Sequence, residues 1–167
     1  MNVKAQVWTA DFIVGLSLFL IVLAASITII VSSNPEDKYD ELYKDTVHLS
    51  NQLMDQGYPG DWNESNVILP GILEEKTRLS TSKLEELSKI GYNRTKNLLH
   101  TKNEYFFYFD DGSKVLDING CVHGHNIATD GECNPLIETL EYENLVKIER
   151  MLIHDSQLIK MVVYSWN

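Results

Sequence analysis

The chain has 167 residues, of which 44% are hydrophobic and 23% are charged. This length is enough for one domain with an appendage, and the composition excludes a disordered, collagen-like or low-complexity chain. The net charge is −10. Residues 1–34 carry one lysine and one aspartate, so the negative charge falls on residues 35–167. Such an acidic region argues against binding to nucleic acid or to anionic lipid head groups, because both require clustered basic residues.

An apolar segment near the start of the chain, Phe12 to Val31, has 20 residues without a charge, an amide side chain or a proline. As a helix it would be about 30 Å long, which is the thickness of a bilayer core. Lys4 precedes the segment and Glu36 and Asp37 follow it, so we expect a cytoplasmic N-terminus and the remaining chain outside the membrane. The alternative is a secretory signal peptide cleaved near Ser26, although the apolar core of such peptides is usually about 7 to 15 residues long.

The residues that lead into this segment, Lys4-Ala5-Gln6-Val7-Trp8-Thr9-Ala10-Asp11-Phe12, resemble the leader junction of archaeal type IV pilin precursors. The resemblance implies a short basic leader, residues 1–5, cut off by a prepilin peptidase after a small residue, which places the cleavage between Ala5 and Gln6. The hydrophobic helix, residues 6–34, then stays in the mature protein. The family favours a glutamate at the fifth mature position. Asp11 is sixth after this cut, and it is fifth if the cut follows Gln6.

Asp11 permits two interpretations, because a carboxylate beside hydrocarbon is costly unless it is hydrated or paired. It either lies among the lipid head groups or pairs with the freed amino terminus of a neighbouring subunit in a filament. Taken alone the residue favours the first interpretation, and the leader pattern adds weight to the second, so both stay open. From Phe12 onward, small residues suited to close helix approach recur along the segment: Gly15, Ser17, Ala24, Ala25, Ser26 and Thr28.

Residues 35–57 predict an amphipathic extension of the apolar helix, in which either the helix kinks near Asn34 or a second helix starts there. Ser33 and Glu36 have capping-box spacing, and Gly57 and Pro59 end the helical pattern. One face is expected to pack on a head domain formed by residues 58–167. The residues that recur at helical spacing are Tyr39, Leu42, Tyr43, Thr46, Leu49 and Leu53.

Two shorter helices are predicted next. Ser82 and Glu85 have capping-box spacing, and an apolar stripe that includes Leu84 runs from there to Gly91. A second helical piece is expected over residues 92–99. The pattern of Leu53, Gly57, Pro59 and Trp62, followed by this helix, resembles one group of uncharacterised archaeal pilin-like proteins.

The rest of the chain predicts strands. Aromatic residues at 105–109 indicate one strand, 110–113 a hairpin turn and 114–118 the returning strand. Two further strands are expected at 146–153 and 158–166. Helices followed by antiparallel hairpins indicate an α+β fold. The resemblance implies the type IV pilin-like arrangement, in which a long N-terminal membrane and assembly helix packs on a small antiparallel sheet.

The two cysteines, Cys121 and Cys133, favour a disulfide, because the head is expected outside the cell, where thiols oxidise. Closing a loop of this size stabilises a fold by about 3 kcal/mol. A zinc site that uses His123 and His125 and a pair of free thiols are the alternatives, but the ligand spacing differs from that of common zinc fingers. We therefore predict no bound metal and expect both histidines in a loop.

Two sequons, at Asn63 and Asn93, are candidate glycosylation sites on an exported head. The acidic groups at 110–117 and 130–132 lack the pattern of an EF-hand loop, so we expect solvated turns there. The sequence contains no phosphate-binding loop, no nucleophile elbow and no zinc-protease motif. We therefore predict no catalytic residue and no cofactor.

The expected function is structural: a major or minor subunit of an archaeal type IV pilus-like surface filament. The expected partners are other pilin subunits, the prepilin peptidase, the membrane assembly machinery and, before assembly, the lipid bilayer. The precursor is expected in the cell membrane as a single-pass protein and later in an extracellular filament. The alternative is a membrane-anchored binding or adhesion module that stays monomeric and recognises its ligand through the aromatic sheet.

Overall fold

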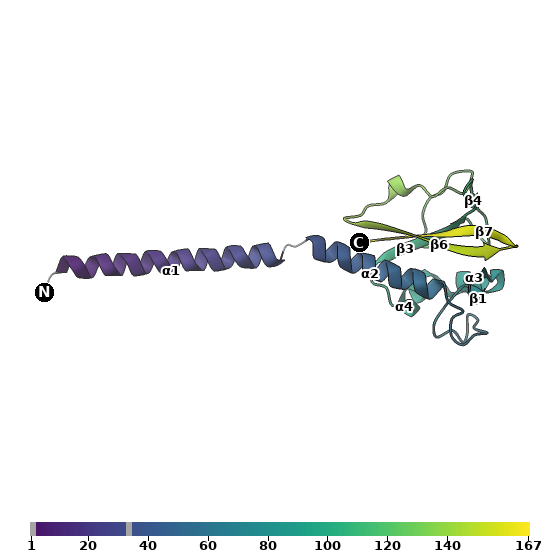
Figure 1. The fold of residues 1–167 in the computed structure, drawn as a ribbon, viewed down its shortest axis with the longest axis horizontal. Helices are drawn as coiled ribbons and strands as arrows, with labels where there is room; N and C mark the ends of the chain where they lie inside the picture. Colours follow the sequence, from purple (N-terminus) through teal and green to yellow (C-terminus); the bar gives the residue numbers. More distant parts are fainter. Residues whose placement is uncertain (1–2, 33–34) are drawn as a thin grey trace. The chain divides into compact units, whose positions relative to one another are not determined.

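The computed structural model of the chain describes the backbone of residues 3–32 and 35–167, and the side chains of residues 11–28 and 38–167. The chain forms two compact units, 1–38 and 39–167, which are described here separately (Figure 1). The first unit consists mainly of the helix α1, Val3–Ser32. The capping box predicted at Ser33 and Glu36 lies outside the described residues.

The second unit, called the head from here on, contains most of the helix α2, Pro35–Leu53, which ends four residues before the predicted limit at 57. Its packed face is the one expected from periodicity, with Leu42, Leu49 and Leu53 at most 1% exposed. Tyr39 and Tyr43 were predicted on this face but are 46% and 49% exposed. Tyr43 follows Leu42 and is therefore turned about 100° away from it around the helix axis.

The predicted motif around Trp62 forms a closed loop between α2 and the sheet. The Trp62 indole N–H donates to the backbone oxygens of Gln56, at 3.1 Å, and Gly71, at 3.0 Å. Gly57 has a φ of +77°, and a Cβ on Gly71 would lie 2.3 Å from the backbone oxygen of Asp55. The motif therefore has a packing role. Position 71 also requires a glycine, because two backbone segments approach each other closely there.

Two short strands and two helices follow the loop. They are β1 (Leu73–Glu75), β2 (Arg78–Leu79), α3 (Thr81–Ile90) and α4 (Tyr92–Leu98). Leu84 is buried in α3 as predicted. The predicted cap is wrong, because the N-cap is Ser80, without a side-chain capping bond, and Ser82 lies inside the helix.

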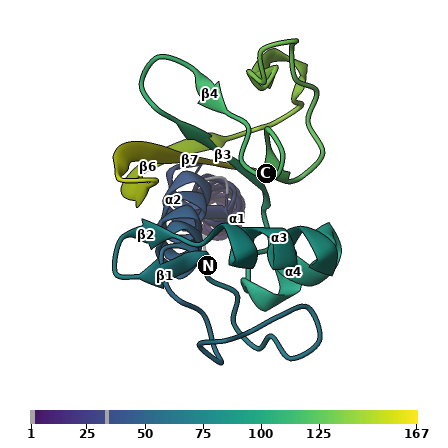
Figure 2. The same cartoon turned by 90° about the vertical axis from the view of Figure 1, so that its right-hand side faces the viewer.

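The sheet contains seven strands in the order β1-β2-β6-β7-β3-β4, with β5 also paired to β3 (Figure 2). The central strands are β3, β6 and β7. The strands β6 and β7 form the predicted antiparallel hairpin, and β3 pairs antiparallel with β7. The expectation of a wholly antiparallel sheet is wrong, because β2 pairs parallel to β6. The bounds are β3 Glu104–Asp110, β4 Val115–Leu116, β5 His123–Gly124, β6 Leu145–His154 and β7 Gln157–Trp166, with a 3₁₀ turn, η1, at Ile137–Thr139.

The two faces of the sheet are covered differently (Figures 1 and 2). The helices α2, α3 and α4 cover one face, where Tyr105, Phe107 and Phe109 are buried. The segment that runs from β5 through η1 covers the other face, where Phe106 and Tyr108 are buried. Every residue of the predicted aromatic strand is therefore in the core, which leaves no exposed aromatic face on that strand as the ligand surface of a binding module.

Candidate assembly helix and polar network of the head

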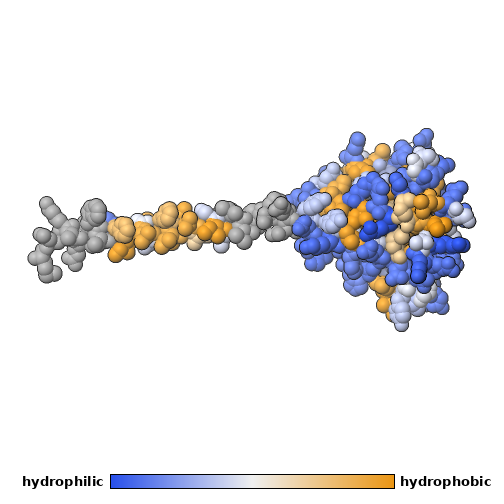
Figure 3. Space-filling view, viewed as in Figure 1, coloured by the Kyte–Doolittle hydropathy of each residue, from blue (hydrophilic) through white to orange (hydrophobic). Residues whose placement is uncertain are grey.

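The helix α1 contains the one stretch among the described residues that is long and apolar enough to cross a membrane, Asp11–Thr28. None of this stretch is buried within the chain, and Phe12 and Ile21 are each 65% exposed. Figure 3 shows this apolar surface and the mostly polar surface of the head. An exposed apolar surface of this size is typical of a segment that contacts lipid or other protein.

The hydroxyl groups in this stretch are satisfied within the helix. Ser17 donates to the backbone oxygen of Ile13 at 2.7 Å, and Ser26 donates to that of Val22 at 2.8 Å. The Thr28 hydroxyl donates to the backbone oxygen of Ala24 at 2.9 Å. Because these groups need no water, they are compatible with an apolar environment. The carboxylate of Asp11 is the only charge in the stretch.

The predicted assembly residues all lie on this exposed helix. Asp11 stands at the N-terminal end of the apolar stretch, next to Phe12. A Cβ on Gly15 would have no neighbour within 4 Å. Ala24, Ala25 and Thr28 are exposed near its C-terminal end. The predicted cleavage residues Ala5 and Gln6 fall in α1, and their side chains lie outside the described residues.

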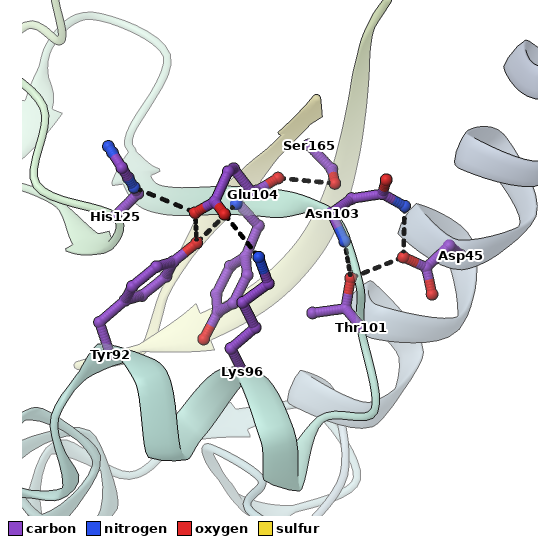
Figure 4. A network of polar contacts seen from close by, with 9 residues as sticks. Asp45, Tyr92, Lys96, Thr101, Asn103, Glu104, His125 and Ser165 are labelled. Atoms are coloured by element: carbon purple, nitrogen blue, oxygen red, sulfur yellow. Dashed lines mark hydrogen bonds and ion pairs between the residues drawn. The ribbon is translucent and has the colours of Figure 1, made fainter. Parts of the chain in front are cut away.

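A polar network centred on Glu104 joins α4 to the sheet (Figure 4). The Glu104 carboxylate accepts hydrogen bonds from the Tyr92 hydroxyl and from Lys96 Nζ, both at 2.5 Å, and lies 3.2 Å from His125 Nδ1. The backbone N–H of Tyr105 donates to the Tyr92 hydroxyl. These contacts hold α4 against the first two residues of β3, Glu104 and Tyr105.

The charge of Glu104 is stabilised by this network. Burial by itself would raise the pKa of the carboxyl group. The hydrogen bonds from Lys96, Tyr92 and His125, together with the charge of Lys96, outweigh burial and lower the pKa below its usual value. Burial and the hydrogen bond to Glu104 raise the pKa of Tyr92, so its hydroxyl stays protonated. The network is therefore a fixed structural connection at neutral pH.

A second polar contact fixes α2 to the same region. Asp45 accepts hydrogen bonds from the Thr101 hydroxyl at 2.6 Å and from the Asn103 amide at 2.7 Å (Figure 4). The Ser165 hydroxyl donates to the backbone oxygen of Glu104 at 2.9 Å. Together these bonds join α2, the start of β3 and the end of β7.

Beside this network lies a cavity of about 220 Å³, between α3, α4 and β5. Rings line it, including those of Tyr92, Tyr105 and His123. His123 is buried against the Phe107 ring, and its Nε2 lies 3.1 Å from the backbone oxygen of Ile118. Burial lowers the pKa of His123, which favours its neutral form.

The cysteines Cys121 and Cys133 form a disulfide, as predicted. The bond excludes the zinc alternative, because both sulfur atoms are used. The expectation that both histidines lie in a loop is wrong for His123, which pairs in β5 with Phe107. The carboxylate of Asp117 lies within 4.8 Å of the two sulfur atoms, but a disulfide offers no thiolate to a metal ion.

The predicted turns carry the acidic groups expected there. The Asp111 carboxylate accepts hydrogen bonds from the side chain and backbone of Ser113 and from the backbone of Lys114, and these bonds lower its pKa. The Asp130 carboxylate likewise accepts hydrogen bonds from the side chain and backbone of Asn134, and these bonds lower its pKa. These carboxylates are occupied in closing the turns.

The two sequons stand in different environments. Asn63 is exposed in the loop before β1, and Asn93 is exposed on α4. The hydroxyl residue of the first sequon, Ser65, is also exposed, whereas that of the second, Thr95, is 4% exposed.

Sequence reasoning missed the Glu104 network and the anchor at Asp45. The spacing of Tyr92 and Lys96 places both on one side of a helix and was a usable signal. No pattern in the sequence indicates that Glu104, eight residues after Lys96, faces that side. Comparisons with models of known protein families, with curated proteins and with solved structures find no match to this chain.

Proposed function

We propose that the protein is a type IV pilin-like subunit of an archaeal surface filament, with a structural and not a catalytic role. The observation that carries the proposal is the unburied apolar stretch Asp11–Thr28 of α1. In the precursor this surface is covered by lipid, and in the filament it is covered by the same helix of neighbouring subunits.

The head supports this proposal because its described core is complete without α1. The three hydrophobic clusters of the head are made by residues between 42 and 166. The head therefore has its own apolar core, and α1 is available for a second environment. The net charge of −10, carried by residues 35–167, favours a hydrated filament surface.

The distribution of small residues around α1 supports contacts with more than one neighbour. At about 100° of rotation per residue, Ser17, Ala24 and Thr28 fall on one side of the helix, Gly15 and Ser26 fall on the opposite side, and Ala25 falls between them. Small residues allow close approach of helices in apolar surroundings. A helix with two such sides can pack against a neighbouring helix on each of them, as in an extended helix bundle. A helix dimer needs only one such side.

Asp11 is proposed to act at assembly. In hydrocarbon its carboxylate is costly without a partner. The amino terminus that leader cleavage would free on a neighbouring subunit is a cation of suitable charge. On this account Asp11→Asn leaves the precursor in the membrane but reduces filament formation, and Asp11→Glu retains it.

Shearing of intact cells tests the proposal, because it releases surface filaments and leaves anchored monomers in the membrane. The wild-type protein is expected in the sheared, pelletable fraction. The variant Ala24→Leu keeps the helix apolar but blocks close approach, so we expect normal membrane insertion and loss of most of the sheared protein. Leu20→Ile, which changes no small residue, is the matched control.

The alternative proposal is a membrane-anchored binding module. It predicts wild-type protein in the membrane fraction alone, with no effect of Ala24→Leu on distribution. The burial of Tyr105 to Phe109 removes the aromatic strand as its ligand surface. The ring-lined cavity of about 220 Å³ beside α4 is the concave site that such a module offers.

A further inference from the structure

In the first sequon both the asparagine and the hydroxyl residue are exposed, whereas in the second sequon only the asparagine is exposed. We propose that Asn63 carries an N-linked glycan and that Asn93 does not. The inference rests on the export of the head, which is part of the proposed function.

The first sequon lies in a turn that presents its amide to solvent. The Asn63 side-chain oxygen accepts hydrogen bonds from the Ser65 backbone N–H at 2.9 Å and from the Ser65 hydroxyl at 2.6 Å. Its backbone N–H donates to the Asn66 side-chain oxygen at 2.7 Å. Both bonds engage the oxygen of the amide, and Asn63 is exposed, so the amide is held in the turn at the surface of the head.

The middle residue of this sequon, Glu64, connects the turn to α3 by a hydrogen bond. The Glu64 backbone N–H donates to Glu86 Oε2 on α3 at 2.9 Å. The hydrogen bond from Lys89, followed by that from Glu64, lowers the pKa of Glu86, so its carboxylate is charged at neutral pH. The sequon is thus ordered and exposed in the folded head.

The second sequon lies in a helix that would have to unwind before it could present the same geometry. Asn93 is the second residue of α4, and the Thr95 hydroxyl donates to the backbone oxygen of Gly91 at 2.9 Å. Thr95 is 4% exposed. The bonds of Tyr92 and Lys96 to Glu104 hold the same helix in place (Figure 4). Asn93 is therefore exposed without an accessible hydroxyl partner.

The modification is a glycosyl transfer from a glycosyl phosphate or diphosphate donor. Nδ2 of Asn63 forms a bond to the anomeric carbon, and the bond between that carbon and the phosphate oxygen breaks. The phosphate leaves with the electron pair, and Nδ2 loses one proton to a base of the transferase. The product is an oligosaccharide attached through an N-glycosidic bond in the loop before β1.

Intact and peptide mass spectrometry of the full-length protein from its own cells tests the inference. We expect the wild-type protein to carry the glycan mass on the Asn63 peptide and none on the Asn93 peptide. Asn63→Gln and Ser65→Ala should lose the added mass. Ser65→Thr, which keeps the hydroxyl group, and Asn93→Gln should retain it.

Protease treatment of intact cells separates this inference from the proposed function. A head that the protease digests is exported, and on such a head a glycan on Asn93, or an unmodified Asn63, overturns the inference alone. A head that the protease cannot reach overturns the topology of the proposed function and the inference with it.

Discussion

Replacing Trp62 by phenylalanine tests whether the loop between α2 and the sheet is held by the indole N–H. This group donates to the backbone oxygens of Gly71 and Gln56. The Gln56 oxygen keeps a second donor, Lys83 Nζ at 2.7 Å, so the Gly71 oxygen is the group that loses its partner. An unpaired buried acceptor costs about 1–3 kcal/mol. The smaller ring costs about 1 kcal/mol more, so the free energy of unfolding should fall by about 2–4 kcal/mol.

Trp166→Phe is the matched control, because Trp166 is 5% exposed and its indole N–H has no hydrogen-bond partner among the described residues. This variant loses ring contacts only, so its expected cost is about 1 kcal/mol. Both variants are compared with the wild type by urea denaturation of the full chain in detergent micelles, followed by near-ultraviolet circular dichroism. Equal losses in the two variants would refute the assigned role of the Trp62 N–H.

Two further perturbations address the disulfide and the Glu104 network. Replacing both Cys121 and Cys133 by alanine opens a loop with a sequence separation of 12, which should lower the free energy of unfolding by about 3 kcal/mol. An unchanged urea midpoint would contradict this. The folded-state pKa of Glu104 is lowered, so its contribution to stability is present above its ordinary value of 4.5 and is lost as the pH falls through the lowered pKa. Urea midpoints measured between about pH 7 and pH 3 should therefore fall less steeply for Glu104→Gln than for the wild type, and parallel pH profiles would show that the network does not stabilise the carboxylate.

The elements with a strong repeating pattern could be predicted from the sequence. The apolar run from Phe12 predicted α1, and the helical recurrence of Leu42, Leu49 and Leu53 predicted the packed face of α2. The two long C-terminal strands were found because each contains a run of β-branched and apolar residues. The α+β class is confirmed by these elements, together with the sheet that they form.

The remaining features depend on contacts between distant residues. The strands β1 and β2 have 3 and 2 residues, too few to show a period, so the parallel pairing of β2 with β6 could not be predicted. The need for glycine at position 71 arises from the backbone of Asp55. The partners of Glu104 come from a helix and from a loop 21 residues away along the chain. Periodicity carries no information about such contacts.

The most direct test of the filament account is the N-terminal sequence and intact mass of protein released by shearing from the cells that make it. The account predicts a mature chain that begins at Gln6 or Val7 and keeps all of the apolar stretch Asp11–Thr28. A released chain that begins after Ser26, or a surface protein that still begins at Met1 in cells with an active prepilin peptidase, would contradict it.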